Sequence, residues 1–136
     1  MKPWFVLSAA MLLFASLPFS ALAAESDVKQ EVSTAHAHAL MAAGADSLKM
    51  THAHLQHVIN CLVGPDGAAF DASAANPCKG QGAGALPDTQ GESSLQGQLE
   101  EALAAAQSGV KTSSLESAQE AANGAAQFLS TADQKL

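Results

Sequence analysis

The stretch "HAHALMAAGADSLKMTHAH", from His36 to His54, decides the fold of this chain. It places one His-Ala-His triplet on each side of a Gly-Ala-Asp break. Glycine commonly ends a helix, and aspartate is a good cap for the start of the next one. The stretch therefore predicts two helices that fold back on each other around Ala45.

Apolar residues recur at helical spacing on both sides of this break. The segment before it repeats every four residues along one face, formed by Val28, Val32, His36 and Leu40. The segment after it has an apolar face of its own, formed by Leu48, Leu55, Ile59 and Leu62. These spacings predict helices over residues 26–43 and 47–62, with Asp46 as the N-cap of the second and Gly64-Pro65 as its stop.

Two more helical segments close the chain. Ser93 with Gln96, and Ser113 with Glu116, have the spacing of capping boxes ahead of apolar runs. They predict helices over residues 94–108 and 114–131. The intervening residues 63–92 are rich in glycine, proline, asparagine and aspartate, which predicts a long loop. We therefore expect an all-α fold, an antiparallel four-helix bundle of two helical hairpins joined by a long crossover loop.

The first 23 residues have the composition of a signal peptide. One lysine precedes an apolar run that ends in Ala21-Leu22-Ala23, a pattern typical of signal-peptidase sites. The alternative is an uncleaved membrane anchor, because the run is about long enough to span a bilayer. We expect cleavage near Ala24, a single helical domain over residues 24–136, and a periplasmic or secreted protein that has no membrane contact after cleavage.

Two cysteines, Cys61 and Cys78, lie in this exported part. A cysteine pair in an oxidising compartment usually forms a disulfide, and this one would tie the crossover loop to the second helix. It would stabilise the fold by about 3 kcal/mol on the chain-entropy model. Metal ligation by Cys61 is the competing interpretation. A recognition or ligand-binding role for the loop also stays open.

The charge balance excludes several classes of partner. Thirteen acidic residues face six basic ones, so the formal net charge is -7. This excess disfavours nucleic acid and anionic membranes. The sequence indicates no particular protein partner.

All five histidines lie between His36 and His57. In an antiparallel hairpin centred on Ala45, His36 reaches the height of His54, and His38 that of His52. Residues two apart on a helix point about 200° apart, so one His-Ala-His triplet cannot chelate from a single face. The sequence predicts a first metal site of His36, His54 and His57, which Met50 or an acidic side chain completes. It predicts a second, looser site of His38 and His52.

Simpler roles for these side chains stay open. A histidine on an apolar helix face, such as His36, is often a hydrogen-bonded core residue, and His38 and His52 fit a polar surface. Methionines at helical spacing more often pack than bind metal. The clustering of all the histidines favours coordination, because neutral imidazole is the commonest metal ligand and suits copper, nickel and zinc.

Signatures of catalysis are missing from the sequence. There is no nucleophile with a histidine and acid partner, no phosphate loop and no H-E-x-x-H. The run "GQGAGAL", residues 80–86, follows no strand and is not a dinucleotide fingerprint. Without C-x-x-C-H, covalent haem is excluded, although haem bound by histidine and methionine stays open. We expect a protein that is not an enzyme.

The exported, alanine-rich, histidine-bearing hairpin resembles those of the small periplasmic metal-binding proteins with four-helix bundles. The resemblance covers mainly residues 36–57 and more faintly the second hairpin, and it implies copper, nickel or zinc binding by His36, His38, His52, His54 and His57. The chain departs from that pattern by having fewer histidines, none in the second hairpin, and a long loop with two cysteines.

These observations favour a periplasmic protein that buffers or carries a divalent transition metal. Its affinity would fall as the pH drops through about 6.5, where imidazole takes up a proton. The alternative is an acid-responsive periplasmic chaperone or interaction module, in which protonated histidines repel each other and loosen the first hairpin. An enzyme that uses the crossover loop as a lid is the third hypothesis.

Overall fold

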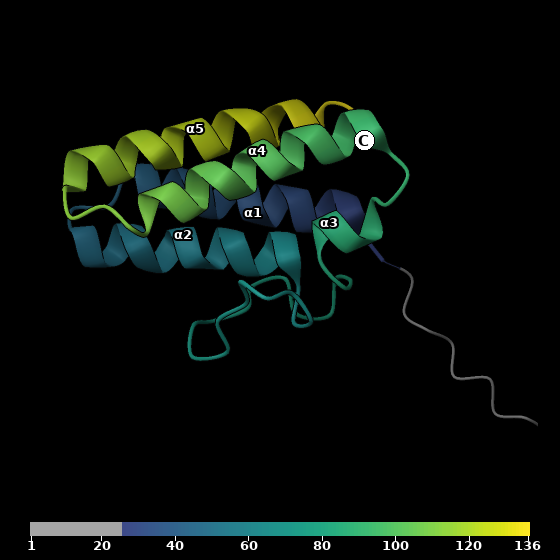
Figure 1. Ribbon diagram of the computed structural model, residues 1–136, viewed down its shortest axis with the longest axis horizontal. Helices are drawn as coiled ribbons and strands as arrows, with labels where there is room; N and C mark the ends of the chain where they lie inside the picture. Colours follow the sequence, from purple (N-terminus) through teal and green to yellow (C-terminus); the bar gives the residue numbers. More distant parts are fainter. Residues whose placement is uncertain (1–25) are drawn as a thin grey trace, which may run out of the picture.

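The computed structural model describes residues 26–136, so the expected signal peptide lies outside the described part. The described chain is all-helical, as predicted (Figure 1). Its five helices are α1 (Val28–Ala43), α2 (Leu48–Val63), α3 (Ala85–Asp88), α4 (Ser93–Gly109) and α5 (Leu115–Asp133). The four long helices begin and end within two residues of the expected ranges. Short α3 interrupts the segment that we expected to be loop throughout, and its four residues are too few to show a period in the sequence.

Side chains cap the starts of α1, α2 and α5. Helix α4 has no side-chain cap and begins at Ser93 itself, so the predicted capping box of Ser93 with Gln96 is wrong. Asp27 accepts a hydrogen bond from a backbone N–H of α1 at 2.9 Å, and Ser47 and Ser114 do the same for α2 and α5 at 3.3 Å. Each cap satisfies a backbone donor that has no partner within its helix. The caps of α2 and α5 each lie one residue after the expected positions, Asp46 and Ser113. In each case the next residue in the sequence, Ser47 or Ser114, is the N-cap instead.

The long helices pack side by side into a helical bundle (Figure 1). Helix α1 contacts both α2 and α5, and α4 contacts both α5 and α2. Between these helices lies one core made largely of alanine and leucine. Small side chains let helix axes approach closely, although each contributes little buried apolar area.

Alanine, and not the larger apolar residues, forms most of the buried face of α1. Ala35, Ala39 and Ala42 are fully buried, whereas Leu40 is 52% exposed and His36 is only half-buried. The predicted face through His36 and Leu40 is therefore wrong. Because α1 packs against both α2 and α5, its smallest side chains face inwards, where there is least room.

The crossover loop is fastened to α2. The predicted disulfide between Cys61 and Cys78 is confirmed, so Cys61 is no thiolate ligand for a metal. Asn60, fully buried on α2, donates to the carbonyl oxygens of Asp71 and Ala75 and accepts from the N–H of Asp71 at 2.9–3.1 Å. These contacts satisfy loop backbone groups that would otherwise lack partners. The loop is thus held against the bundle (Figure 1).

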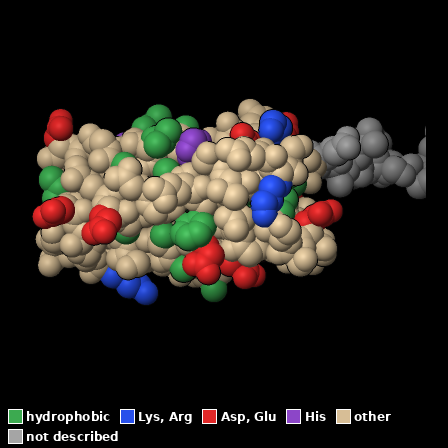
Figure 2. Space-filling view, turned by 90° about the horizontal axis from the view of Figure 1, so that it is seen from above, with side chains coloured by type: hydrophobic (Ala, Val, Ile, Leu, Met, Phe, Trp, Pro, Cys, Tyr) green, Lys and Arg blue, Asp and Glu red, His purple; other side chains and the backbone are tan. Residues whose placement is uncertain are grey.

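The surface shows no strong concentration of one charge on the face drawn in Figure 2, where acidic side chains are scattered among a few lysines. Within residues 26–136, no helix has both the length and the apolar character needed to cross a bilayer.

Candidate metal centre

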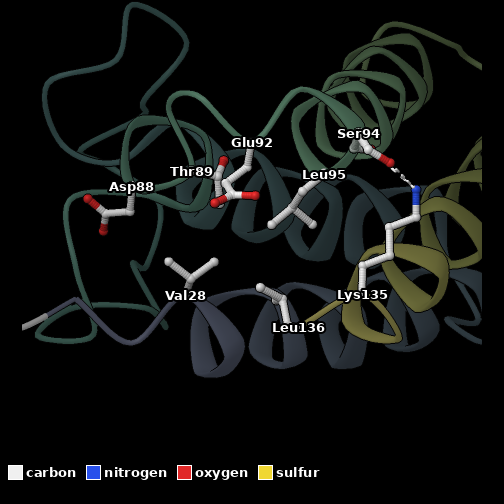
Figure 3. A pocket seen from close by; sticks show the side chains of 8 residues that line it. All are labelled: Val28, Asp88, Thr89, Glu92, Ser94, Leu95, Lys135 and Leu136. Atoms are coloured by element: carbon white, nitrogen blue, oxygen red, sulfur yellow. Dashed lines mark hydrogen bonds between the residues drawn. The ribbon is translucent and has the colours of Figure 1, made fainter.

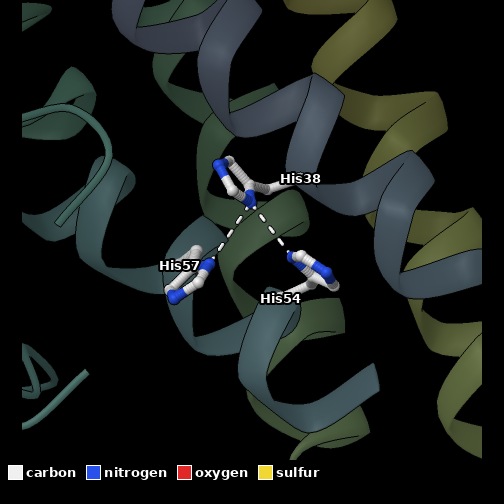
Figure 4. A group of neighbouring side chains, drawn as sticks. All are labelled: His38, His54 and His57. Atoms are coloured by element: carbon white, nitrogen blue, oxygen red, sulfur yellow. Dashed lines mark hydrogen bonds between the residues drawn. The ribbon is translucent and has the colours of Figure 1, made fainter. Parts of the chain in front are cut away.

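Three imidazole rings meet between α1 and α2. His38 comes from α1, and His54 and His57 come from α2 (Figure 4). Nδ1 of His38 lies 3.2 Å from Nδ1 of His54 and 3.3 Å from Nδ1 of His57. One nitrogen from each ring lies within 4.8 Å of the other two, and no other group of three metal-capable side chains in the described part is so close together. We call these three residues the histidine cluster.

The first hairpin brings the cluster together. Residues three apart on a helix are neighbours on its surface, so α2 presents His54 and His57 side by side. The link of four residues between the helices then returns the chain so that α1 places His38 opposite them. Gly44 N–H bonds back to α1, and the carbonyl oxygen of Ala45 accepts from Gln119 of α5 at 2.9 Å. Contacts with α1 and with α5 thus fix the turn between α1 and α2.

Hydrogen bonding alone satisfies this arrangement poorly. Nδ1 of a neutral imidazole is either a donor or an acceptor, and it has only one hydrogen or one lone pair to offer. Nδ1 of His38 faces two other Nδ1 atoms at once. A cation would satisfy all three nitrogens together. In a tetrahedral zinc site with Zn–N bonds of 2.0–2.1 Å, ligand nitrogens lie about 3.3 Å apart, which matches the two short contacts.

Burial keeps part of the cluster uncharged. Burial, together with the neighbouring His57 and His54, lowers the pKa of His38 from 6.5 to about 4. Burial and the nearby His54 also lower the pKa of His57. His38 is therefore neutral at physiological pH, which is the form that coordinates metal. Perturbed pKa values of this kind are enriched at functional sites.

The cluster can be reached from outside. All three rings are half-buried rather than enclosed. A surface hollow of about 400 Å³ is bordered by His54 together with Met41, Asp46 and Met50. Both methionines are about half exposed, at 50% and 47%. Met50, the expected fourth ligand, thus lies at the hollow and makes no hydrogen bond to the cluster.

The structure groups the histidines differently from the sequence pattern. It brings His54 and His57 together, but their third member is His38 and not His36. His36 lies half-buried on the opposite margin of the alanine face, outside the cluster. The expected partner of His38, His52, also stays apart, and its Nε2 is buried with no hydrogen-bond partner in the described part of the chain. The spacing of Ala35, Ala39 and Ala42 marks the buried face of α1, and this spacing was the sequence signal that could have identified His38 as the third member.

A larger hollow, of about 560 Å³, opens where α1 and α4 begin (Figure 3). Its wall mixes the apolar Val28 and Leu95 with Glu92 and Lys135. Lys135 donates a hydrogen bond to the hydroxyl of Ser94 at 2.7 Å, so its ammonium group is already hydrogen-bonded. No set of metal ligands converges there, which leaves the histidine cluster as the better candidate site.

Comparison of the chain with protein-family models, curated proteins and solved structures gave no match.

Proposed function

We propose that this protein binds one divalent transition metal ion, Cu(II), Ni(II) or Zn(II), through the histidine cluster, and that it buffers or carries this ion. The observation that carries the proposal is the convergence of three Nδ1 atoms, two pairs of which lie 3.2 and 3.3 Å apart. Imidazole suits all three metals, and raw affinity favours Cu(II) among them.

The open character of the site fits exchange better than permanent structure. A structural zinc site usually has four protein ligands, whereas a three-ligand site leaves a position for water or an incoming ligand. The half-buried rings and the adjacent hollow support reversible loading. Binding and release need only neutral imidazoles, so the proposal includes no catalytic step.

The setting of the site is part of the proposal. The leader pattern and the disulfide support export to an oxidising compartment such as the periplasm. The helix contacts support an antiparallel four-helix bundle of two hairpins, which is the architecture of the small periplasmic metal-binding proteins that the sequence resembles.

Equilibrium dialysis tests the proposal directly. The oxidised chain is dialysed against each metal at pH 7.5, beside a triple alanine variant of His38, His54 and His57. A double alanine variant of His36 and His52 is the matched control, because it also removes imidazoles from α1 and α2. We expect one ion per chain, lost in the triple variant and kept in the control. No uptake by the unmodified chain, or equal loss in both variants, would rule out the site.

The same closeness supports a second candidate function, an acid-responsive interaction module. Protonating two rings of the cluster would place like charges 3.2–3.3 Å apart and open the first hairpin. The lowered pKa of His38 sets this response near pH 4. Binding of an apolar dye by metal-free protein at pH 4 and pH 7 tests it, since no gain at pH 4 excludes the response.

A further inference from the structure

A second unusual group lies outside the histidine cluster, where the crossover loop crosses α1. Glu31 of α1 is fully buried. Its Oε1 accepts a hydrogen bond from Gly84 N–H at 3.0 Å, while its Oε2 is buried and has no partner in the described part of the chain. A buried carboxylate with an unpaired oxygen is costly, so this one requires an explanation.

Asp88 of α3 lies close to this carboxyl. Between them lies Gly82, at which a Cβ atom would lie 2.3 Å from Oδ2 of Asp88 and 2.6 Å from Oε1 of Glu31. The two acidic side chains therefore meet on the same side of Gly82, in space that only glycine leaves free. Oδ2 of Asp88 also accepts from Ala83 N–H at 2.8 Å. Both carboxyl groups thus bind backbone N–H groups of the same loop segment, residues 82–84, which we call the acid-bound segment.

The charged groups that face Glu31 are acidic. They are Asp88 from α3 and Asp27 at the start of α1. The nearest lysine along α1, Lys29, pairs instead with Asp133 at 3.4 Å. Burial and the nearby Asp88 and Asp27 together raise the pKa of Glu31 from 4.5 to about 7, against the hydrogen bond from Gly84, which lowers it.

We propose that Glu31 and Asp88 share one proton that fastens the acid-bound segment to α1, and that losing this proton loosens the segment. In the closed state the carboxylic acid of Glu31 donates its O–H to the carboxylate of Asp88. Loss of the proton to water leaves two carboxylates facing each other, which repel. Asp88 borders the open hollow of Figure 3, whereas Glu31 is fully buried, so Asp88 gives the proton its route to solvent.

A proton fits this pair better than a metal ion does. Calcium takes six to eight oxygen ligands, and magnesium demands octahedral geometry. The pair offers two carboxyl groups, and one oxygen of each already accepts a backbone N–H. A proton needs only one oxygen from each side chain.

The remaining contacts of this loop confine the opening. Gln81 accepts from the backbone N–H of Asp27 at 2.7 Å, and its side chain bonds to Thr34 at 3.2 Å. The disulfide at Cys78 holds the preceding residues. None of these contacts titrates near neutral pH, so only the acid-bound segment responds to the proton. The device does not depend on metal binding by the histidine cluster.

The sign of the pH effect follows from the raised pKa. The closed state holds the proton up to about pH 7, whereas a carboxyl exposed by opening loses it near 4.5. Opening should therefore increase as the pH rises between these values, by up to about tenfold per pH unit, and then level off. Acid fastens the segment and alkali loosens it.

NMR on the oxidised chain tests the device. We expect the carboxyl carbon of Glu31 to titrate near pH 7, and the exchange protection of the Gly84 amide to fall at least tenfold from pH 5 to pH 7.5. Glu31→Gln keeps an acceptor for Gly84 and a donor toward Asp88 but carries no charge, so its protection should not vary with pH. Glu101→Gln, at an exposed site on α4, is the control and should retain the pH dependence.

Three results would overturn the proposal. One is a Glu31 carboxyl that titrates near its ordinary value, and another is the same pH dependence in Glu31→Gln. The third is a shift of the Glu31 titration by millimolar calcium, which would identify a cation site instead. If Glu31→Gln does not fold, Asp88→Asn replaces it, since loss of the like charge should lower the Glu31 titration point, and an unchanged titration would refute the shared proton.

Discussion

Replacing His38 by alanine removes the one ring that makes both short Nδ1–Nδ1 contacts of the histidine cluster. The two rings left on α2 have centroids 5.6 Å apart and come from one helix face. Loss of a hydrogen-bond partner behind a metal ligand already costs about 10–100-fold in affinity. Loss of a direct ligand should therefore weaken zinc binding by at least about 100-fold.

Thermal unfolding with added zinc measures this loss. At a free zinc concentration about 100 times the Kd, ligand binding stabilises the unmodified protein by about 2.7 kcal/mol. For a domain of this size that raises the Tm by about 10 °C. A 100-fold weaker site is only half occupied at the same concentration, which leaves about 0.4 kcal/mol, or about 2 °C.

His36→Ala is the matched control for this experiment. It removes an imidazole from the same helix, two residues away, but from outside the cluster. We expect it to keep nearly the full zinc-induced rise in Tm. A rise that falls equally in both variants would mean diffuse surface binding, and a larger fall in His36→Ala would refute the geometry described for the cluster.

Four further predictions concern metal affinity at low pH, stability at low pH, the disulfide and core packing. The pKa of His38 is lowered to about 4, so protons do not compete with zinc for this ring at pH 5.5. Zinc affinity, measured by competition titration, should therefore fall between neutral pH and pH 5.5 by about tenfold less than it would for a site of three ordinary imidazoles. The same shift means that His38 destabilises the metal-free protein as the pH falls from 6.5 toward 4, whereas Glu31 acts in the opposite direction over this range, so denaturant unfolding of Glu31→Gln would show the loss caused by His38. Reducing the disulfide between Cys61 and Cys78, which are 17 residues apart, should lower the unfolding free energy by about 3 kcal/mol. Denaturant unfolding in the presence and in the absence of a reductant measures this difference. Gly109→Ala should cost about 1–3 kcal/mol, since its Cβ would lie 2.5 Å from a leucine methyl carbon of α2, whereas Gly97→Ala, with nothing within 4 Å, should stabilise α4 by about 0.5–1 kcal/mol. Equal effects of the two alanines would contradict this packing.

The sequence contained enough information to locate the helices and the disulfide. Helix ends depend on nearby caps and glycines, so Gly44 marked the end of α1 and Ser113 and Ser114 marked the start of α5, whereas the start of α4 carries no side-chain cap. Only one pairing is possible for two cysteines. The sequence also showed that the histidines gather on one hairpin, because that follows from spacing along the chain.

Tertiary packing alone decided which histidines share a site. His36 and His38 point about 200° apart on α1, so the rotation of that helix determines which one faces α2. Hydropathy ranked Leu40 above alanine and favoured the face of His36, but the close approach of α2 and α5 buried Ala35 and Ala39 instead. The rotation of α1 depends on the shapes of α2 and α5, and the spacing of residues along α1 contains no information about those shapes. The meeting of Glu31 with Asp88 is likewise a product of folding, because the two acids are 57 positions apart in the sequence and nothing in their local sequence relates them.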